Sequence, residues 1–368
     1  MVTESVKVGV IGVGFGSVVQ IPGFQSEGVE ILAVAARREE RAQEAAERFG
    51  IPSFFTDYRK MLEVPEIEAV SVVSPVPLHK EMAIASLEAG KHVLCEKPFA
   101  VNQRDAHEML EASQRNKHLT AMIGHEFRWA PQRAFTKDLL DQGYIGKLHF
   151  VNTSLLIGRQ RPATPPLLEP QADLGRRGGF LWGLGSHYID AMRHWFGDIV
   201  SVTGKMASHF PERTDPTTGN VRNSEVDDSF SFIFEFANGG WGTMMASSAA
   251  PAGQGAVIEI FGNEGSLSTP QALPGVNPPQ NGVVYGGKSG DAVRQEIPMP
   301  DHFHPFDDDR DARLLPFRLM VREFVRGIRG GTSPAPNFYD GYKCQQVLDA
   351  VVESSQTGRR VEIPLDSQ

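Results

Sequence analysis

The sequence predicts an α/β protein with two domains: a doubly wound parallel sheet, followed by an α/β domain with a large, mostly antiparallel open sheet. Three observations support this prediction. Short apolar runs alternate with helix-compatible segments over the first third of the chain, a glycine-rich turn follows the first run, and long strand-like segments dominate after about residue 125. Such alternation is typical of a parallel sheet with helices on both faces.

The first third of the chain contains five apolar runs of the length expected for buried parallel strands. They are residues 7–11, 30–35, 69–73, 92–95 and 120–123. Helix-compatible segments lie between them, at residues 38–49 and 103–115. We therefore expect a first domain over residues 1–125, built around a parallel sheet.

The sequence pattern changes in the rest of the chain, which we expect to form a second domain over residues 126–368. Strands are expected at residues 147–157, 200–208, 229–237, 240–249 and 257–261, and helices at 130–142, 313–329 and 342–354. Phenylalanine occupies every second position in Ser229–Phe236, and Asn238-Gly239-Gly240 then predicts a hairpin turn. The last helix is a candidate to pack back on the first domain.

The glycine-rich turn, Gly12-Val13-Gly14-Phe15-Gly16-Ser17, directly follows the first apolar run. Gly12 permits a tight turn, and Gly14 lets phosphates approach the backbone. Phe15 and Gly16 lead into a helix whose N-terminus would face a pyrophosphate. The fingerprint is slightly irregular, because Ser17 stands at the third small position. Its place between a strand and a helix predicts a dinucleotide-binding Rossmann domain.

The end of the second strand bears on the choice of cofactor. An acidic residue usually binds the ribose 2′-hydroxyl at this point, but the strand runs into Ala35-Ala36-Arg37-Arg38. Two arginines after a small residue suit a 2′-phosphate, so we expect NADP(H). NAD(H) is the alternative if Arg37 and Arg38 are only solvated residues at the start of a helix.

Composition argues against several classes of function. The 36 Lys and Arg residues against 45 Asp and Glu give a net charge of −9, which disfavours a nucleic-acid partner. No apolar run reaches membrane-spanning length, and the N-terminal residues lack a signal-peptide pattern. Cys95 and Cys344 provide no disulfide framework, so we expect a cytoplasmic protein. His302 and His304 alone do not make a zinc pattern, and no metal is expected.

The tripeptide Glu96-Lys97-Pro98 follows a later strand of the same domain. A lysine there suggests hydride transfer, because a cation beside a carbinol stabilises the developing alkoxide. Together with the glycine turn, the Gly178-Gly179 pair and the run Gly185-Ser186-His187-Tyr188-Ile189-Asp190, this tripeptide resembles the Gfo/Idh/MocA oxidoreductases. The resemblance keeps the motif order over nearly the whole chain.

The resemblance implies NAD(P)-dependent oxidation or reduction of a sugar, polyol or sugar-derived carbonyl, and homodimers or homotetramers formed through the second sheet. Lys97 would contact both the nicotinamide ribose and the reacting hydroxyl, and Glu96 would lie beside the cofactor. His187 would be the general acid–base. With Ser186 as N-cap, His187 would lie in the first helical turn, where the dipole favours the neutral imidazole that accepts a proton.

The resemblance implies roles for further residues, at positions that match the family's motifs. Ser74, Pro75 and His79 would line the adenine and ribose side of the cofactor, with helix capping as the alternative for His79. His125 would lie near the substrate, with a hydrogen-bonded core histidine as the alternative. Arg128 would pair either with the substrate or with an acidic group.

The chain departs from the family pattern one helical turn before His187. The family's usual aspartate is replaced by Gly183. Trp182 would either occupy the space of that carboxylate or stack on a sugar ring. Asp190 would bind substrate or cap the helix end. Asp190 or His125 is a candidate to assist His187.

Three functions remain open on these grounds. The preferred one is an NAD(P)-dependent dehydrogenase or reductase acting on CH–OH groups, because Lys97 and His187 are both present. The second is a glycosidase-like enzyme that uses a transient redox step with bound NAD. The third is a non-catalytic NADP-binding regulatory protein, because fold alone does not determine function.

Overall fold

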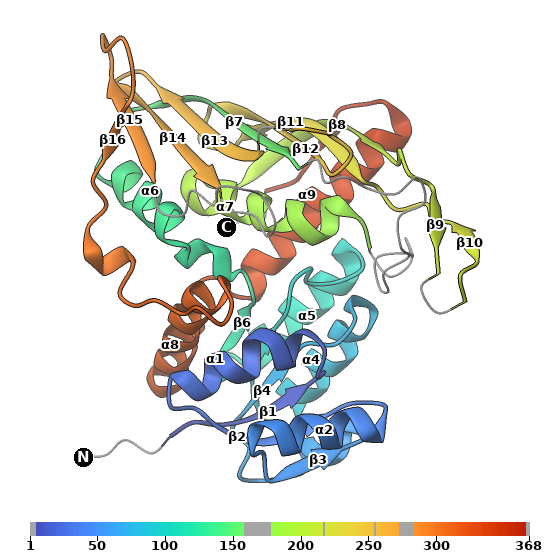
Figure 1. Cartoon of the computed structure of the whole chain (residues 1–368). Helices are drawn as coiled ribbons and strands as arrows, with labels where there is room; N and C mark the ends of the chain where they lie inside the picture. The colour runs from blue at the N-terminus through green and yellow to red at the C-terminus, as the bar shows by residue number, and fades with distance from the viewer. Residues whose placement is uncertain (1–4, 158–177, 216–217, 254, 272–282, 366–368) are drawn as a thin grey trace. The chain divides into compact units, whose positions relative to one another are not determined.

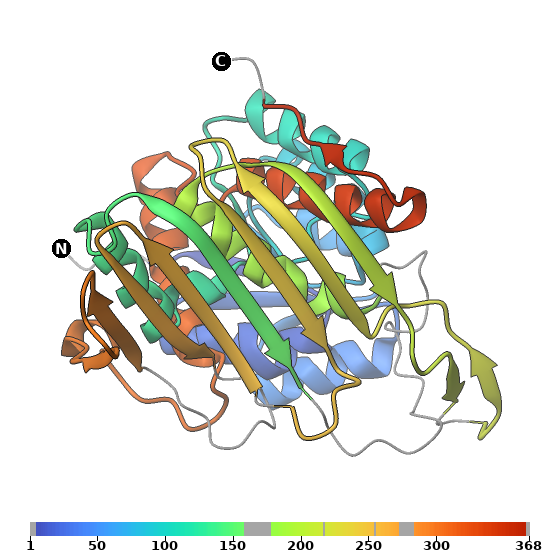
Figure 2. The same cartoon turned by 90° about the horizontal axis from the view of Figure 1, so that it is seen from above.

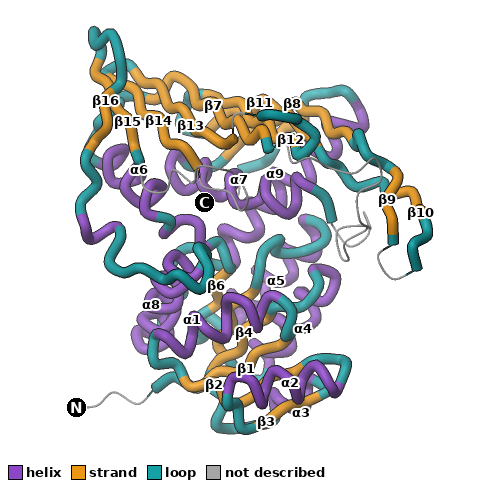
Figure 3. The backbone as a smooth tube through the Cα atoms, in the orientation of Figure 1, coloured by secondary structure: helices purple, strands orange, loops and turns teal. Residues whose placement is uncertain are grey.

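The computed structural model describes residues 5–157, 178–215, 218–253, 255–271 and 283–365. The chain forms two compact units, and each consists of two stretches. The first unit comprises Met1–Trp129 and Phe306–Gln345, and the second comprises Ala130–Pro305 and Gln346–Gln368. The first unit therefore also contains residues 306–345, which the expected boundary at residue 125 assigns to the second domain. Figure 3 shows how helices and strands follow one another along the chain.

A six-stranded parallel sheet lies at the centre of the first unit, in the order β3-β2-β1-β4-β5-β6 (Figure 1). Its strands are β1 (Lys7–Ile11), β2 (Glu30–Ala35), β3 (Ser53–Phe55), β4 (Ala69–Val72), β5 (His92–Cys95) and β6 (Ala121–Ile123). The five predicted strands are confirmed. The edge strand β3 was missed because its three residues are largely exposed and form no apolar run. The order reverses between β1 and β4, and dinucleotides bind in the crevice at such a point.

Two apolar layers cover the faces of this sheet. The helices of one layer are η1 (Gly16–Gln20), α1 (Ile21–Ser26), α2 (Glu39–Phe49) and α8 (Leu314–Gly330). Those of the other are α3 (Tyr58–Leu62), α4 (His79–Glu88) and α5 (Gln103–Arg115). The short helices η2 (Val76–Leu78) and η3 (Glu126–Trp129) follow β4 and β6.

Helix α8 belongs to the first unit although it is far from it in sequence. The rings of Phe24 on α1 and Phe317 on α8 meet edge to face, with centroids 5.5 Å apart. A Cβ added to Gly23 would overlap the Phe317 ring, so the two helices can approach this closely only because residue 23 is glycine. The C-terminal stretch therefore completes the core of the nucleotide-binding unit.

A nine-stranded sheet dominates the second unit, in the order β16-β15-β14-β13-β7-β12-β11-β8-β17. Its strands are β7 (Leu148–Leu156), β8 (Ile199–Ala207), β11 (Ser229–Phe236), β12 (Trp241–Ser247), β13 (Gly255–Gly262), β14 (Gly265–Gln271), β15 (Val284–Lys288), β16 (Gln295–Ile297) and β17 (Val361–Glu362). Only β7 and β12 pair in parallel; the other neighbours are antiparallel, as predicted. Between β8 and β11, the short strands β9 (Glu212–Thr214) and β10 (Val221–Asn223) pair with each other.

Helices cover one face of the large sheet, and the other face is open. Helices α6 (Pro131–Asp141) and α7 (Ser186–Phe196) lie on one face (Figure 1), and Figure 2 looks onto the strands from the other side. Phe230 and Phe232 are buried on the covered side of β11, whereas Ile233 on β11 and Met245 on β12 are exposed. The other helices in the described ranges are η5 (Leu181–Gly185), η6 (Asp301–Phe303) and α9 (Phe338–Thr357), and α9 passes from the first unit into the second.

The predicted hairpin turn joins β11 to β12. Gly239 and Gly240 have φ angles of +87° and +83°, which glycine adopts without strain. In the part of the chain that the structure describes, no helix combines the length and apolar content needed to cross a bilayer.

Candidate active site

The glycine turn after β1 has the backbone that a dinucleotide site requires. Gly12 has a φ of +110°, and a Cβ there would overlap the carbonyl oxygen of Val73 after β4. A Cβ on Gly14 would meet no described atom within 4 Å, so this stretch of backbone is open to a ligand. Gly16 opens η1 directly after Phe15. The turn therefore fits a pyrophosphate bound by backbone N–H groups at a helix N-terminus.

Arg37 and Arg38 lie between β2 and α2, and both side chains are exposed. Arg38 is the N-cap residue of α2 and makes no side-chain capping bond. Neither guanidinium forms an ion pair with another residue in the described ranges. Both cations are thus available to an anionic ligand at this edge of the sheet.

His79 opens α4 and is 1% exposed. Its Nδ1 lies 3.0 Å from the carbonyl oxygen of Pro98, and its Nε2 lies 2.8 Å from that of Ser74. Burial lowers the pKa of His79, against the opposing effect of these carbonyls. The imidazole therefore joins the Ser74–Pro75 loop to the segment after Lys97, and it makes no capping bond to α4.

Lys97 lies at the carboxyl end of β5, and a hydrogen-bond network holds its backbone in place. Its N–H donates to Oε2 of Glu96 at 3.1 Å, and its peptide bond to Pro98 is cis. Oε1 of Glu96 accepts from Nε2 of Gln20 at 2.6 Å, and Gln20 in turn accepts from the Ser71 hydroxyl. Gln20 and Ser71 are fully buried. This network links β4, η1 and β5 beneath the lysine.

Glu126, which the sequence analysis did not single out, lies in the same cluster of charges. It opens η3 just after β6 and is 2% exposed. Burial and the neighbouring Glu96 raise the pKa of Glu126 to about 8, although Lys97 and Arg313 oppose the shift. Burial also raises the pKa of Glu96, against the effect of Lys97. A carboxylate just past a buried strand was the sequence signal that could have identified Glu126.

Arg313 joins this cluster from the N-terminal end of α8. Its guanidinium pairs with Asp311 at 2.6 Å and lies 5.0 Å from the centroid of the Phe15 ring in the glycine turn. Nothing local in the sequence identifies Arg313 as a site residue, because only the packing of α8 brings it to the turn.

Arg128 and His125 are buried in the first unit. Nη2 of Arg128 lies 2.9 Å from Oδ1 of Asp340 on α9, and the two side chains are 5% and 16% exposed. Of the two partners expected for Arg128, the structure therefore shows the acidic group. His125 is 1% exposed.

The helix that carries His187 begins earlier than predicted. η5 runs directly into α7, and the Ser186 hydroxyl donates to the carbonyl oxygen of Trp182 at 2.7 Å. The prediction of Ser186 as N-cap is wrong, because Ser186 lies inside a continuous helical segment. His187 consequently lies beyond the first turn, where the effect of the dipole has fallen off.

Asp227 caps this helical segment instead. Its Oδ2 accepts hydrogen bonds from the backbone N–H groups of Phe180 and Leu181, at 3.1 and 2.8 Å. The side chain packs against Gly179, where a Cβ would overlap Oδ1 and φ is +108°. Burial raises the pKa of Asp227 to about 7, against the lowering effect of the Leu181 N–H.

We expect Asp227→Asn to flatten the pH dependence of stability. Between about pH 4 and 7 the unfolded chain ionises this carboxyl while the folded chain retains the proton, so the stability contributed by Asp227 falls as pH rises. The slope for one such group is about 1.4 kcal/mol per pH unit. Urea unfolding at pH 5, 6 and 7 measures it. An equal slope in wild type and variant would contradict the assignment.

His187 and its helical neighbours are positioned within the second unit. His187 is 4% exposed, and its carbonyl oxygen accepts from Nη1 of Arg133 at 3.4 Å. Arg133 also donates from Nε to Gln271 at 2.8 Å and lies over the Tyr188 ring. Sequence reasoning missed Arg133, which connects α6, α7 and β14.

Gly183 is exposed, and a Cβ there would meet no described atom within 4 Å. Trp182 is fully buried, so its indole does not occupy this open space. Asp190, one turn after His187 on α7, is 1% exposed. The first unit thus brings together the glycine turn, Glu96 and Lys97. In the second unit, His187 and Asp190 lie on α7, and Trp182 lies on η5, which runs directly into α7.

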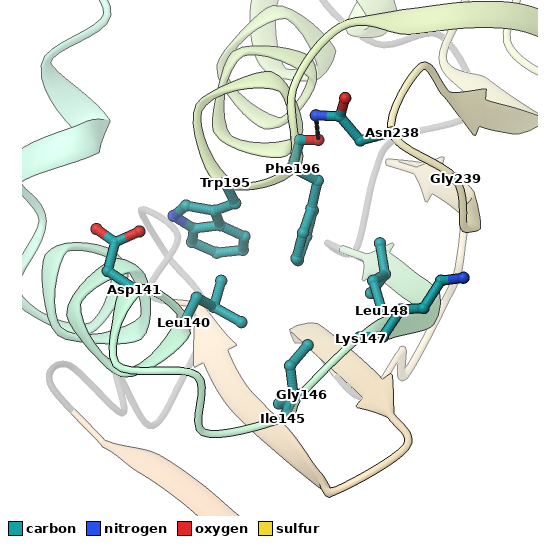
Figure 4. Close-up of a pocket in the computed structure, with 10 residues that line it drawn as sticks. All are labelled: Leu140, Asp141, Ile145, Gly146, Lys147, Leu148, Trp195, Phe196, Asn238 and Gly239. Carbon is teal, nitrogen blue, oxygen red and sulfur yellow. Dashed lines mark hydrogen bonds between the residues drawn. The ribbon is translucent and has the colours of Figure 1, made fainter.

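A cavity of about 250 Å³ lies elsewhere in the second unit, where α6 and α7 meet the start of β7 and the β11–β12 turn (Figure 4). Its lining includes Leu140, Trp195 and Phe196, and none of the predicted site residues. No group of three or more His, Cys, Asp or Glu residues in the described ranges is arranged to hold a metal ion.

Comparisons with known proteins extend these observations. Residues 6–125 match the oxidoreductase family with an NAD-binding Rossmann fold, and residues 137–363 match its C-terminal alpha/beta domain. Levoglucosan dehydrogenase of Pseudarthrobacter phenanthrenivorans is 29% identical over 356 residues, covering 90% of this chain and 89% of the relative. Myo-inositol 2-dehydrogenase of Thermotoga maritima is 26% identical over 358 residues, covering 97% and 98%.

Solved structures of other proteins match the fold of this chain over nearly its full length. A crystal structure of an oxidoreductase domain protein from Kribbella flavida has a TM-score of 0.88 at 27% identity, covering 99% of this chain and 100% of that one. Levoglucosan dehydrogenase in complex with NADH and L-sorbose has a TM-score of 0.87 at 25% identity, covering 98% and 100%. The chain is a member of the Gfo/Idh/MocA family of oxidoreductases.

Proposed function

We infer that this oxidoreductase transfers a hydride between a nicotinamide dinucleotide and a CH–OH group of a sugar, polyol or sugar-derived carbonyl. The observation that carries the proposal is Lys97, held at the carboxyl end of β5 by the Glu96–Gln20 network in a unit whose glycine turn is open to a dinucleotide. Relatives named levoglucosan dehydrogenase and myo-inositol 2-dehydrogenase support the substrate class.

The chemistry divides between two residues in this proposal. The bound nicotinamide supplies the hydride acceptor or donor. The Lys97 ammonium stabilises the negative charge that develops on the substrate oxygen. The His187 imidazole accepts the hydroxyl proton during oxidation and returns it during reduction.

The binding residues are part of the same proposal. Gly12, Gly14, Phe15 and Gly16 contact the pyrophosphate side of the cofactor, and Ser74, Pro75 and Glu96 lie along its path. His79 positions the Ser74–Pro75 loop through its two carbonyl contacts. His125 and Asp190 serve the substrate side. Packing roles are proposed for Arg128, which pairs with Asp340, and for the buried Trp182.

We propose a preference for NADP(H), based on Arg37 and Arg38. Replacing both with alanine should weaken NADPH binding by about ten- to hundredfold, since hydrogen bonds to charged groups contribute about 1.5–3 kcal/mol. NADH binding should change less than about twofold, because it lacks the 2′-phosphate. Fluorescence titration with both cofactors measures this, with the exposed Arg41→Ala as control. Equal losses for NADPH and NADH would contradict the proposed preference.

A carbohydrate panel read at the nicotinamide absorbance tests the reaction itself. Net turnover on a sugar or polyol supports the dehydrogenase. The absence of a carboxylate at Gly183 favours a second candidate, in which a transient redox step leaves no net change in the cofactor. Glycoside cleavage with tightly bound NAD and no net redox change would support that candidate instead.

The assembly is proposed to be a homodimer or homotetramer formed through the open face of the large sheet. Exposed Ile233, Trp241 and Met245 lie on that sheet, and the Trp241 ring stacks on Phe150 with centroids 5.5 Å apart. Exposed apolar patches of this kind mark interaction surfaces. Sedimentation equilibrium measures the native mass independently of molecular shape. A cytoplasmic location is proposed with it, supported by the buried cysteines Cys95 and Cys344, which form no disulfide.

A further inference from the structure

Glu96 and Glu126 form a buried pair of carboxyl groups at the carboxyl ends of adjacent strands. Cys95 of β5 and Ile123 of β6 are in register, and the Gly124 N–H donates to the Cys95 carbonyl at 2.7 Å. A Cβ on Gly124 would lie 3.2 Å from the Glu96 carboxyl group, which therefore packs directly against this backbone. Glu126 follows two residues later on the same segment.

The two carboxyl groups receive different hydrogen bonds from the protein. Glu96 accepts hydrogen bonds from the Gln20 amide and the Lys97 N–H. Oε2 of Glu126, although buried, has no hydrogen-bond partner among the described residues. Two like charges in one buried site cannot both ionise at low cost. When one of the two carboxyl groups keeps its proton, that group is therefore Glu126, because its ionised form would have fewer hydrogen-bond donors than that of Glu96.

The charges that face Glu126 come from three elements. Glu96 and Lys97 follow β5, and Arg313 stands at the N-terminal end of α8. On its own segment Arg128 is paired with Asp340 and His125 is buried. Asp311 pairs with Arg313 and belongs to the same cluster. With Glu126 neutral, Glu96, Lys97, Arg313 and Asp311 sum to no net charge; with Glu126 ionised, the cluster carries one net negative charge, which a cationic ring balances.

The position of this cluster in the sheet indicates which half of a dinucleotide it meets. The glycine turn follows β1, and the ribose-recognition position follows β2, so the adenosine half belongs to β1, β2 and β3. The second mononucleotide half of the sheet is β4, β5 and β6, and the Glu96–Glu126 pair lies at the ends of β5 and β6. The nicotinamide half therefore falls on the side of this pair.

We propose that Glu126 is the ionisable counter-charge of the oxidised nicotinamide, so that binding of the oxidised cofactor releases a proton from Glu126 and binding of the reduced cofactor does not. The proposal rests on the dinucleotide-dependent function proposed above. The oxidised ring carries a positive charge and the reduced ring carries none. A nearby cation favours the ionised carboxylate. The Glu126 carboxyl loses its proton to solvent, and no bond to the cofactor forms.

This coupling makes the affinity for the oxidised cofactor depend on pH. Only the form with ionised Glu126 binds the cationic ring well, so affinity rises with pH up to the pKa of about 8 and then levels off. A downward shift of about two units on binding corresponds to roughly a tenfold gain in affinity between pH 6.5 and 8. It also corresponds to release of roughly 0.8 proton at pH 7.

Isothermal titration calorimetry of the full-length protein in phosphate and in Tris, two buffers of different ionisation enthalpy, counts the released protons. The probes are NADP⁺ and NADPH, and NAD⁺ and NADH, each across pH 6.5–8.5. We expect proton release and rising affinity for the oxidised form only. Comparing oxidised and reduced forms of one cofactor cancels any titration of the 2′-phosphate.

Three variants isolate Glu126. Glu126→Gln should abolish the proton release and the tenfold pH effect while changing NADPH affinity less than about twofold. Glu126→Asp, which retains an acid, should restore part of the release. Exposed Glu44→Gln is the matched control and should behave like wild type.

The possible results separate this inference from the proposed function. Binding of both cofactor forms without a difference in proton release would overturn the counter-charge role and leave the oxidoreductase proposal standing. The same is true if wild type and Glu126→Gln release equal numbers of protons. Failure of all four dinucleotides to bind would overturn both proposals together.

Discussion

Lys97→Ala is expected to lower kcat/KM by about 10³-fold while leaving the fold and cofactor binding nearly intact. Removing one preorganised group that stabilises a developing oxyanion typically costs about 10²–10³-fold in rate. The Glu96 hydrogen bond to residue 97 uses the backbone N–H, which alanine retains. The Gln20–Glu96 network should therefore persist in the variant. Steady-state kinetics on the substrate identified by the carbohydrate panel measures the loss.

The control for this prediction separates chemistry from folding. The circular dichroism spectrum should match wild type, and the dinucleotide Kd should change by less than about tenfold. Lys97→Arg keeps a cation but changes its shape and reach, so it should recover only part of the activity. Wild-type turnover in Lys97→Ala would show that the lysine does not touch the reacting oxygen.

Asp340→Ala is expected to destabilise the first unit by about 3–5 kcal/mol, because it leaves a buried arginine without its counter-charge. The Arg128 side chain is 5% exposed, and Asp340 also accepts a hydrogen bond from the Asn337 N–H at 2.9 Å. Denaturant unfolding followed by circular dichroism measures the loss. If the two units unfold in separate transitions, the shift should appear in only one of them.

A matched surface pair provides the control for Asp340. Arg326 and Glu323 pair on α8 with side chains 72% and 28% exposed, so Glu323→Ala should change stability by less than about 1 kcal/mol. Arg128→Met combined with Asp340→Leu should recover most of the stability, because no buried charge remains. A loss below about 1 kcal/mol in Asp340→Ala would show that solvent or another group compensates Arg128.

Local sequence patterns predicted the parallel sheet well. The five buried strands are continuous apolar runs, and α2 and α5 coincide with the predicted helices to within one residue. Each of these elements is specified by residues next to one another in the chain, and so is the glycine turn after β1. Strand β3, with three largely exposed residues, has no such pattern and was found only in the structure.

The start of the helix that carries His187 shows where local reasoning fails. Gly185 and Ser186 look like a helix entry in the sequence, but the segment is already helical from Leu181. Its cap is the carboxyl group of Asp227, a residue that lies far along the chain. The same applies to Arg313, which reaches the glycine turn only because α8 packs beside α1.

The sequence by itself determined the family, the two-sheet architecture and the place of Lys97 just after a buried strand, since each depends on a short motif or a local period. Only the tertiary structure revealed the partner of Arg128, the capping role of Asp227 and the pairing of Glu96 with Glu126. These features depend on charge and burial created by segments that are distant in sequence. A carboxyl group's protonation is set by the charges and solvent around it in space, and the linear order of residues does not specify them.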